Sequence, residues 1–398
     1  MIIYALINKE IIPYILVEKK VKEEYLIRKT KQPEEKIKKW LDPIDTTLPT
    51  IKQAKELAKH LHIPFAALYM NKQDIPIKKI PKLPNYRTFQ GKTDIDDSCL
   101  NLAISDVLME REFFLNESEN LGLPITPFSI TAPPSDEASE WAKVIRQDFS
   151  IDLKQQFKCQ SPRKFYLYLR ERIEAKGIIV QCFSDVLLEV ARGFSIYEHT
   201  LPVIGLNAND RPPAKSFSLI HELVHLLKRE SSLCNDMVTS NSAAKEEVFC
   251  NAVAGELLVP QKAIEIKLRT GNYQKPYSLD NIRTMANTFS VSREVIVRRL
   301  LNIGIIDQTE YNTYNNAFRQ EIEREKAEQK IARQEGNSKG IPRDISRETY
   351  DKTSSAVSGL LRYGYGEDFF SKRDIAQHLG IAQKHVDKYL MEVSKWNS

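Results

Sequence analysis

Apolar residues in the first 72 positions recur every three or four residues, which is the spacing of one helix face. The pattern predicts helices over 11–19, 21–29, 34–41 and 51–61, with a final turn at 65–69. Proline at position 33 suits the first turn of the third helix. We therefore expect residues 1–72 to form a small helical bundle, followed by a proline-interrupted linker over 73–98.

The middle of the chain alternates between long helical patterns and short apolar runs. Helices are expected over 100–121, 137–149 and 165–175. The runs at 178–183, 194–197 and 201–207 are short and apolar, and they predict strands. We expect the last of them to be an edge strand, along which an extended polypeptide can add by backbone pairing. The residues of that strand proposed to face a substrate are Val203, Ile204, Gly205, Leu206 and Asn207.

Beyond residue 210 the pattern is helical again. One apolar helix surrounds position 221 and a second runs to Pro260, and shorter helices follow up to residue 301. A charged helix over 319–335 has few apolar positions and leads through a flexible linker to a helical tail. We divide this part into segments 99–310, 311–344 and 345–398. The expected fold is mainly α with a small β-sheet, of the α+β class.

Composition narrows the setting of the protein. Hydrophobic residues make up 42% of the chain, an ordinary share for a folded globular protein. No run of about 18 apolar residues occurs, and the N-terminus lacks the features of a signal peptide, so we expect a cytoplasmic protein without a membrane partner. The five cysteines form no CxxC pair, which favours reduced thiols over a disulfide framework.

Charge is distributed unevenly along the chain. Residues 1–90 hold 18 basic and 10 acidic residues, a net charge of +8, so the remainder carries −3 of the total +5. A basic N-terminal segment on a mildly acidic body is typical of a module that binds nucleic acid or an acidic partner. The stretch PTIKQAKELAKHLHIPFAALY, within five short helices, resembles the Xre/Cro-type helix-turn-helix domain. That resemblance implies that the third helix enters the major groove of DNA.

Two interpretations of the third helix are equally favoured. Lys36, Lys38 and Lys39 are the best candidates for phosphate contacts. Glu34 and Glu35, however, occupy the helix end where base contacts are usually made, and acids there would face phosphate. DNA binding through residues 1–72 and a bundle kept for protein contact therefore both stay open.

The strongest chemical motif is His221-Glu222-Leu223-Val224-His225. Histidines four apart on a helix leave the same face, about 6 Å apart along the axis. Two neutral imidazoles so placed can ligate one Zn²⁺, and Glu222 can act as general base on water. Apolar neighbours indicate that this helix is buried on most sides.

A catalytic zinc site needs a third protein ligand and one open position. The candidates from this sequence are Glu230, Cys234, Asp236, Glu246, Glu247 and Cys250. Glu247 is favoured over Glu246 because Asn251 follows it by four residues on the same face, where its amide can accept a hydrogen bond from a ligand histidine. The competing role for either acid is support of the helix dipole at the N-terminus.

Three stretches together resemble the ImmA/IrrE family of metallo-endopeptidases. They are LPVIGLN at 201–207, FSLIHELVH at 217–225 and EVFCNAVAGELLVP at 247–260. The NYRT stretch at 85–88 is similar to an upstream signature of that family. The resemblance covers roughly residues 85 to 300, and many members also carry an Xre-type helix-turn-helix in front. Residues 300–398 extend beyond the family pattern.

The resemblance implies a zincin-like metallopeptidase core flanked by helical N- and C-terminal units. It implies that His221, His225 and Glu247 bind one Zn²⁺ and that Glu222 is the base, with Asn251 supporting a ligand. It further implies cleavage of a transcriptional regulator, such as a repressor or antitoxin-like protein, in a stress, phage or mobile-element response.

The expected function is therefore a zinc endopeptidase acting on a protein substrate, a transcriptional repressor above all. The alternative is a DNA-binding regulator whose zincin domain is a sensor or a protein-interaction scaffold. A donor that stabilises the transition state is also expected. Tyr197 and His199 are candidates, with ordinary surface or core roles as the favoured alternative.

Overall fold

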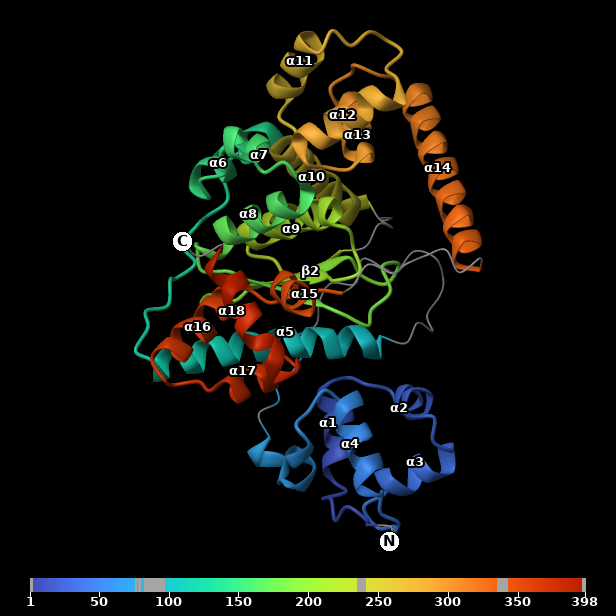
Figure 1. Cartoon of the computed structure of the whole chain (residues 1–398), viewed down its shortest axis with the longest axis vertical. Coiled ribbons are helices and arrows are strands. Elements are labelled where there is room, and N and C mark those ends of the chain that lie inside the picture. The colour runs from blue at the N-terminus through green and yellow to red at the C-terminus, as the bar shows by residue number, and fades with distance from the viewer. Residues whose placement is uncertain are drawn as a thin grey trace.

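The computed structural model describes residues 3–75, 77, 80–81, 97–234, 241–334 and 343–395. The chain is mostly helical with one small sheet, which confirms the expected α+β class. An N-terminal helical unit lies at one end of the molecule, and the sheet and the remaining helices form the larger body (Figure 1). Among the helices described, none combines the length and the apolar character needed to cross a membrane.

The N-terminal unit contains the short helices that the sequence predicts and has its own apolar core. Trp40 and Ile37 from the third helix and Leu57 from the fourth are almost fully buried in it. Thr50 and Gln53 form a capping box that begins the fourth helix. The helices are α1 (Ile11–Glu18), α2 (Glu23–Thr30), α3 (Glu34–Leu41) and α4 (Ile51–His60), with 3₁₀ turns at Phe65–Tyr69 and Lys72–Asp74.

The sheet has four strands in the order β1-β3-β2-β4. Strand β3 is parallel to β1 and antiparallel to β2, and β2 pairs antiparallel with β4. The strands are β1 (Ile179–Phe183), β2 (Gly193–Ile196), β3 (Val203–Asn207) and β4 (Ser232–Cys234). The sequence predicts the first three, whereas β4 lies in a passage that its pattern leaves as a polar connection.

The prediction that residues 201–207 form an edge strand is wrong. All five residues of β3, namely Val203, Ile204, Gly205, Leu206 and Asn207, are buried, and β1 and β2 pair with its two sides. Because both rows of its backbone groups are already used, β3 cannot receive a substrate strand. The sheet edges are β1 and β4.

Helices cover both faces of the sheet. Helix α5 (Ser98–Asn120) contacts β1 and β3 on one face, and α9 (Pro212–Leu227) contacts β2 and β3 on the other, as Figure 1 shows. Helix α8 (Pro162–Glu174) packs beside α9, and α10 (Asn241–Leu258) packs against both α9 and α6 (Ala138–Asp148). The short α7 spans Leu153–Lys158. Helix α9 is therefore enclosed between the sheet and α10.

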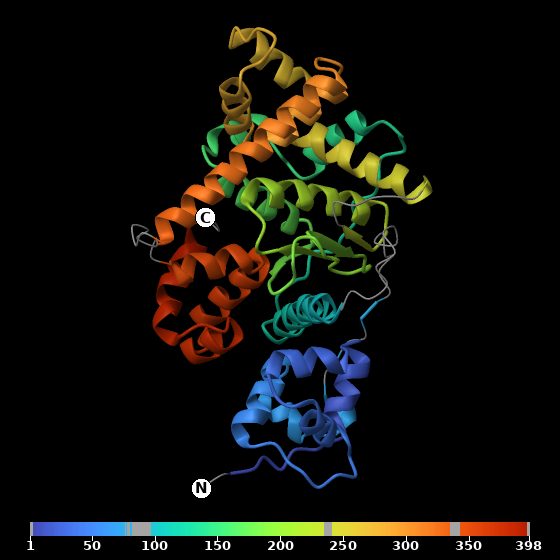
Figure 2. The same cartoon turned by 90° about the vertical axis from the view of Figure 1, so that its right-hand side faces the viewer.

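The rest of the chain surrounds this centre. Helices α11 (Gln261–Thr270), α12 (Leu279–Phe289) and α13 (Arg293–Asn302) precede the long α14 (Gln308–Gln334), which Figure 2 shows running along one side of the body. Helix α14 begins before the predicted residue 319, because Tyr311, Tyr314 and Phe318 bury their rings against the body at helical spacing.

The C-terminal helices are packed onto the larger body of the molecule. They are α15 (Ile345–Lys352), α16 (Ser355–Gly366), α17 (Lys372–His378) and α18 (Val386–Ser394). Their buried residues join the same apolar cluster as the sheet and α9, so this unit has no separate core. Buried Arg170 of α8 donates to the carbonyl oxygens of Tyr350 and Thr353 at 3.0 and 2.9 Å. The hydrogen bonds and the shared core together fix the C-terminal unit to α8.

Candidate metal centre

Helix α9 carries the predicted motif in a buried position. Two prolines occupy its first turn, where their missing N–H groups cost nothing. Apolar residues on most sides pack against the sheet, α8 and α10. The exposed fractions of His221, Glu222 and His225 are 1%, 0% and 0%. Two imidazoles and a carboxyl group are therefore held in an apolar interior, where polar groups are stable only with partners.

Helix α10 brings a second carboxylate to the two histidines. Its buried face packs along α9, and Glu247 is only 2% exposed. The Oε2 atom of Glu247 lies 3.1 Å from His221 Nε2, and its Oε1 atom lies 3.3 Å from His225 Nε2. The two Nε2 atoms are 3.3 Å apart. Three donor groups from two helices thus converge on one point.

These separations fit a single metal ion. Ligands about 2.0–2.1 Å from a tetrahedral ion are about 3.3 Å from one another, which follows from the tetrahedral angle. The three observed separations lie between 3.1 and 3.3 Å. His221, His225 and Glu247 also form a buried group whose ligand atoms are close enough to hold an ion together. The donor set, two imidazoles and one carboxylate, is one that zinc takes in proteins.

Unsatisfied buried atoms support the same conclusion. Glu247 Oε1 makes no hydrogen bond although it is buried. Buried carboxylate oxygens are rarely left without a partner, because desolvation costs more than the group recovers. A cation bound between the histidines and Glu247 would satisfy this oxygen.

Asn251 accepts a hydrogen bond from one of the histidines. His221 Nδ1 donates to Asn251 Oδ1 at 3.0 Å, one helical turn beyond Glu247 on α10. With the proton on Nδ1, the lone pair of Nε2 faces Glu247 and is free for a metal. The i to i+4 spacing between Glu247 and Asn251 therefore places both side chains at the centre.

The other proposed third ligands take different positions. Glu246 forms an ion pair with Lys228 at 2.7 Å. Glu230 is 45% exposed and lies 3.9 Å from His225 Nδ1, on the side away from Glu247. Cys250 is buried beside His225 and outside the group of three ligands. The side chains of Cys234 and Asp236 fall outside the described residues.

The pKa values of Glu247 and His225 are shifted in opposite directions. Burial would raise the pKa of Glu247, but its close approach to His221 and His225 outweighs burial and lowers the pKa to about 2. Burial would lower the pKa of His225, but Cys250, Glu230 and Glu247 raise it well above its ordinary value, so a metal that binds here displaces the proton of this imidazole. Glu247 is therefore ionised at neutral pH, the form that binds a cation.

Glu222 points from α9 toward the sheet. Its Oε2 atom accepts a 2.5 Å hydrogen bond from Ser232 on β4, and its Oε1 atom has no hydrogen-bond partner. Gly193 on β2 borders this carboxylate, because a Cβ atom at that position would lie 3.3 Å from Oε1. The sequence gives no sign of Ser232, since the pairing that brings it to Glu222 is between distant strands.

The remaining predicted site residues lie elsewhere. Tyr197 is half-buried and His199 is exposed, after β2, so neither belongs to the buried ligand group. Asn207 is buried and donates to the carbonyl oxygens of Val186 and Ala191, which is a structural role. The 85–88 stretch lies outside the described residues.

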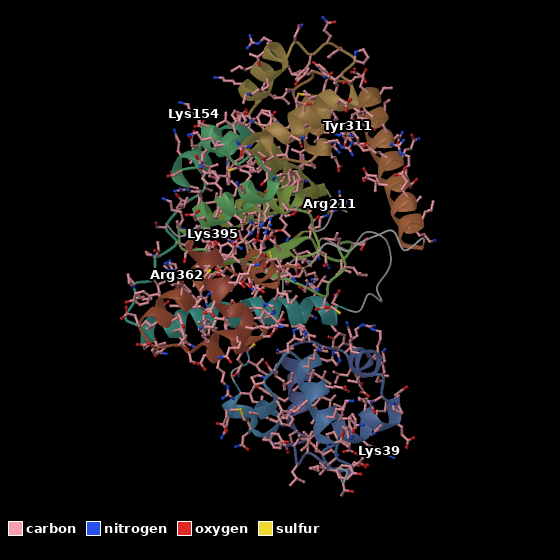
Figure 3. The ribbon with its side chains drawn as sticks, in the orientation of Figure 1. Lys39, Lys154, Arg211, Tyr311, Arg362 and Lys395 are labelled. Carbon is pink, nitrogen blue, oxygen red and sulfur yellow. The ribbon has the colours of Figure 1, made fainter. Side chains whose placement is uncertain are left out.

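The three lysines proposed for DNA contact are on α3, far from this centre. Lys38 pairs with Glu34 at 2.6 Å and Lys39 with Glu35 at 2.8 Å. Lys36 lies 5.3 Å above the ring of Trp40. Figure 3 shows Lys39 on the outer side of the N-terminal unit. Two of the three charges are therefore balanced on the helix itself.

Comparison with known proteins places the centre within a peptidase-like segment. Residues 175–301 match a family model described as the IrrE N-terminal-like domain, which is a peptidase family. This segment contains the sheet, α9 and α10, and so all three candidate ligands and Glu222. No curated protein and no solved structure matches the chain. The match supports a metallopeptidase domain in this part of the protein.

Proposed function

We propose that the protein is a zinc-dependent endopeptidase that cleaves a transcriptional regulator. The single observation that carries the proposal is the convergence of His221, His225 and Glu247 at metal-ligand spacing, with Glu222 on the same helix as the two histidines. The similarity of residues 175–301 to a peptidase family supports the reaction class. The group of three buried ligands suits Zn²⁺, and we propose one ion per chain.

Each residue of the proposed site has its own role in the reaction. A Zn²⁺ ion held by the three ligands supplies Lewis acidity, which makes water more acidic and polarises a carbonyl group. Glu222 accepts a proton from the attacking water and passes it to the leaving amine. Asn251 fixes the ring of His221 so that Nε2 faces Glu247, where it would bind the ion. Glu222 Oε1, which makes no hydrogen bond, is the oxygen we assign to proton transfer.

The proposed substrate is a transcriptional repressor or an antitoxin-like protein in a stress, phage or mobile-element response. Support for it comes from the resemblance of the central stretches to the ImmA/IrrE family and of the first 72 residues to Xre/Cro-type domains. Because its first 72 residues resemble such a regulator, the protease can associate with regulators of the same class. We place this activity in the cytoplasm, where such a substrate is found.

Glu222→Gln tests the reaction while preserving the metal site. The amide keeps the shape of the side chain but cannot accept the water proton. We expect both proteins to contain one zinc ion per chain. Only the unsubstituted protein should cleave an Xre-type regulator that is encoded beside it. Zinc binding without cleavage of any candidate regulator or unfolded protein would contradict the protease assignment.

A second candidate function is DNA binding by residues 1–72, with the zincin domain as a sensor or scaffold. The net charge of +8 over residues 1–90 favours it. The ion pairs of Lys38 and Lys39 with glutamates on α3 weaken it, because paired lysines attract phosphate less. A DNA mobility shift at low salt that disappears in the triple alanine variant of Lys36, Lys38 and Lys39 would support this function. Absence of any shift at low salt would favour protein contact.

A further inference from the structure

We propose that Ser232 and Ser195 are positioning residues that hold the general base Glu222 for catalysis. This inference rests on the proposed peptidase function and assigns a role to two buried hydroxyl groups on the sheet face that α9 covers. It arises from one chain of contacts. Ser195 Oγ lies 2.8 Å from Ser232 Oγ, which in turn lies 2.5 Å from Glu222 Oε2.

The direction of these hydrogen bonds follows from the groups involved. An ionised carboxylate only accepts hydrogen bonds, so Ser232 must donate its proton to Glu222. Ser232 then has only acceptor capacity left for its neighbour, and Ser195 must donate to it. The chain therefore runs from Ser195 through Ser232 to Glu222, and it presents two aligned O–H dipoles to one carboxylate oxygen.

The sheet makes this arrangement rigid. Ser195 and Ser232 are directly opposite each other in the antiparallel pairing of β2 and β4. Both are completely buried, as is Glu222. Directly opposite residues point to the same face of a sheet, here the face covered by α9. Both hydroxyl groups are thus fixed by strand register and by packing.

The two carboxylate oxygens of Glu222 therefore have different surroundings. Oε2 is held by Ser232, whereas Oε1 is buried beside Gly193 and has no hydrogen-bond partner. The absence of a Cβ atom at Gly193 leaves room for this oxygen, since an added Cβ atom would lie 3.3 Å from it. Ser232 therefore holds Glu222 in one rotamer and leaves Oε1 as the oxygen without a hydrogen bond, the one we assign to proton transfer.

The test compares Ser232→Ala, Ser195→Ala and the threonine variants of both positions, all loaded with zinc. Ser231→Ala is the matched control, because the Ser231 hydroxyl accepts from the backbone of Tyr197 and not from the Glu222 chain. For cleavage of the regulator identified with Glu222→Gln, we expect Ser232→Ala to lower kcat roughly tenfold to a hundredfold. KM and zinc content stay unchanged, and Ser231→Ala keeps the full kcat.

The threonine variants and the double alanine variant distinguish a role in positioning Glu222 from a contribution to protein stability alone. Threonine keeps the hydroxyl group and suits a strand, so Ser195→Thr or Ser232→Thr restores kcat relative to alanine. Ser195→Ala gives a smaller loss alone and no further loss in the Ser232→Ala background, because Ser195 acts through Ser232. Additive losses from the two alanine variants, or an unchanged or higher kcat in Ser232→Ala, would overturn the inference.

A crystal structure of zinc-loaded Ser232→Ala provides a readout independent of activity. We expect Glu222 to leave its single position while His221, His225 and Glu247 stay in place. If Glu222 keeps the same position in that structure, the inference is overturned, even when kcat falls. If the unsubstituted protein cleaves no regulator, the proposed function fails, and the position of Glu222 in the structure still decides the role of Ser232.

Discussion

At the scale of single residues, the centre is defined by the partner that each side chain takes. His221 is oriented by Asn251, and its other nitrogen faces His225 and Glu247. Glu246, next to Glu247 in the chain, satisfies Lys228 instead. Adjacent acids on one helix point about 100° apart, so only one of them can face α9.

This difference gives a direct prediction about zinc content. Glu247→Ala removes one of three ligands and should reduce bound zinc far below one ion per chain. Glu246→Ala should keep the full stoichiometry, because it removes only a partly exposed ion pair worth about 1 kcal/mol or less. Metal analysis of the two purified variants measures both. Zinc lost from Glu246→Ala and retained by Glu247→Ala would show that the ligand was assigned to the wrong acid.

The candidate ligand set could be derived from the sequence because helical spacing is local. Two histidines four apart, and Glu247 with Asn251 four apart, each define one helix face without knowledge of the fold. Ser195 and Ser232 could not be predicted, because strand register between β2 and β4 brings them together across a long stretch of chain. The position of β3 in the interior of the sheet has the same origin, since strand order is set by tertiary pairing.

At the scale of elements, buried charges hold the C-terminal helices against α8. Arg170 is 1% exposed and lies 3.8 Å from Glu174, while Glu174 accepts hydrogen bonds from the backbone N–H groups of Val180 and Ser355. A carboxylate at the beginning of α16 also suits the helix dipole. Residues 345–398 were expected to form a small domain from their sequence pattern, which carries no information about this docking surface.

Removing Arg170 should therefore destabilise the whole body. Arg170→Met leaves Glu174 buried without its cation, which costs about 3–5 kcal/mol for a buried pair. Arg362→Met is the control, since Arg362 is an exposed residue of α16 on the surface of the same unit (Figure 3). Its change should stay within about 0.5 kcal/mol. Denaturant unfolding followed by circular dichroism measures both, and equal stability of the two variants would contradict this role of Arg170.

The stability of the N-terminal unit should depend on pH through one buried lysine. Lys19 donates to the carbonyl oxygens of Leu61 and His62 at the end of α4, and burial lowers its pKa to about 8. The unfolded chain therefore binds more protons than the folded chain above pH 8, and stability rises with pH in that range. Tyr25, whose pKa burial raises to about 12, acts oppositely only above pH 10.

Between pH 8 and 10 we expect Lys19 to add up to about 3 kcal/mol to the stability of the N-terminal unit. Lys19→Met should remove the rise with pH, whatever its effect at pH 7. Trp40 fluorescence during denaturant unfolding reports on this unit, provided that Trp141 and Trp396 are replaced by Phe. A rise of the same size in Lys19→Met would assign it to other groups.

At the scale of the whole molecule, the candidate metal centre lies inside a body that extends well past residues 175–301, the peptidase-like segment. The apolar cluster around α9 continues into α12, α13 and the C-terminal helices, whereas the N-terminal unit has a core of its own. His62 of that unit lies 2.6 Å from Asp106 of α5.

The most direct test of the central claim compares the purified protein with Glu222→Gln. Both should bind one zinc ion per chain, since the ligands His221, His225 and Glu247 are unchanged. Only the unsubstituted protein should cut its regulator, and a chelator should stop the cutting until zinc is restored. Equal cutting by Glu222→Gln, or cutting that persists in the chelated protein, would contradict the account.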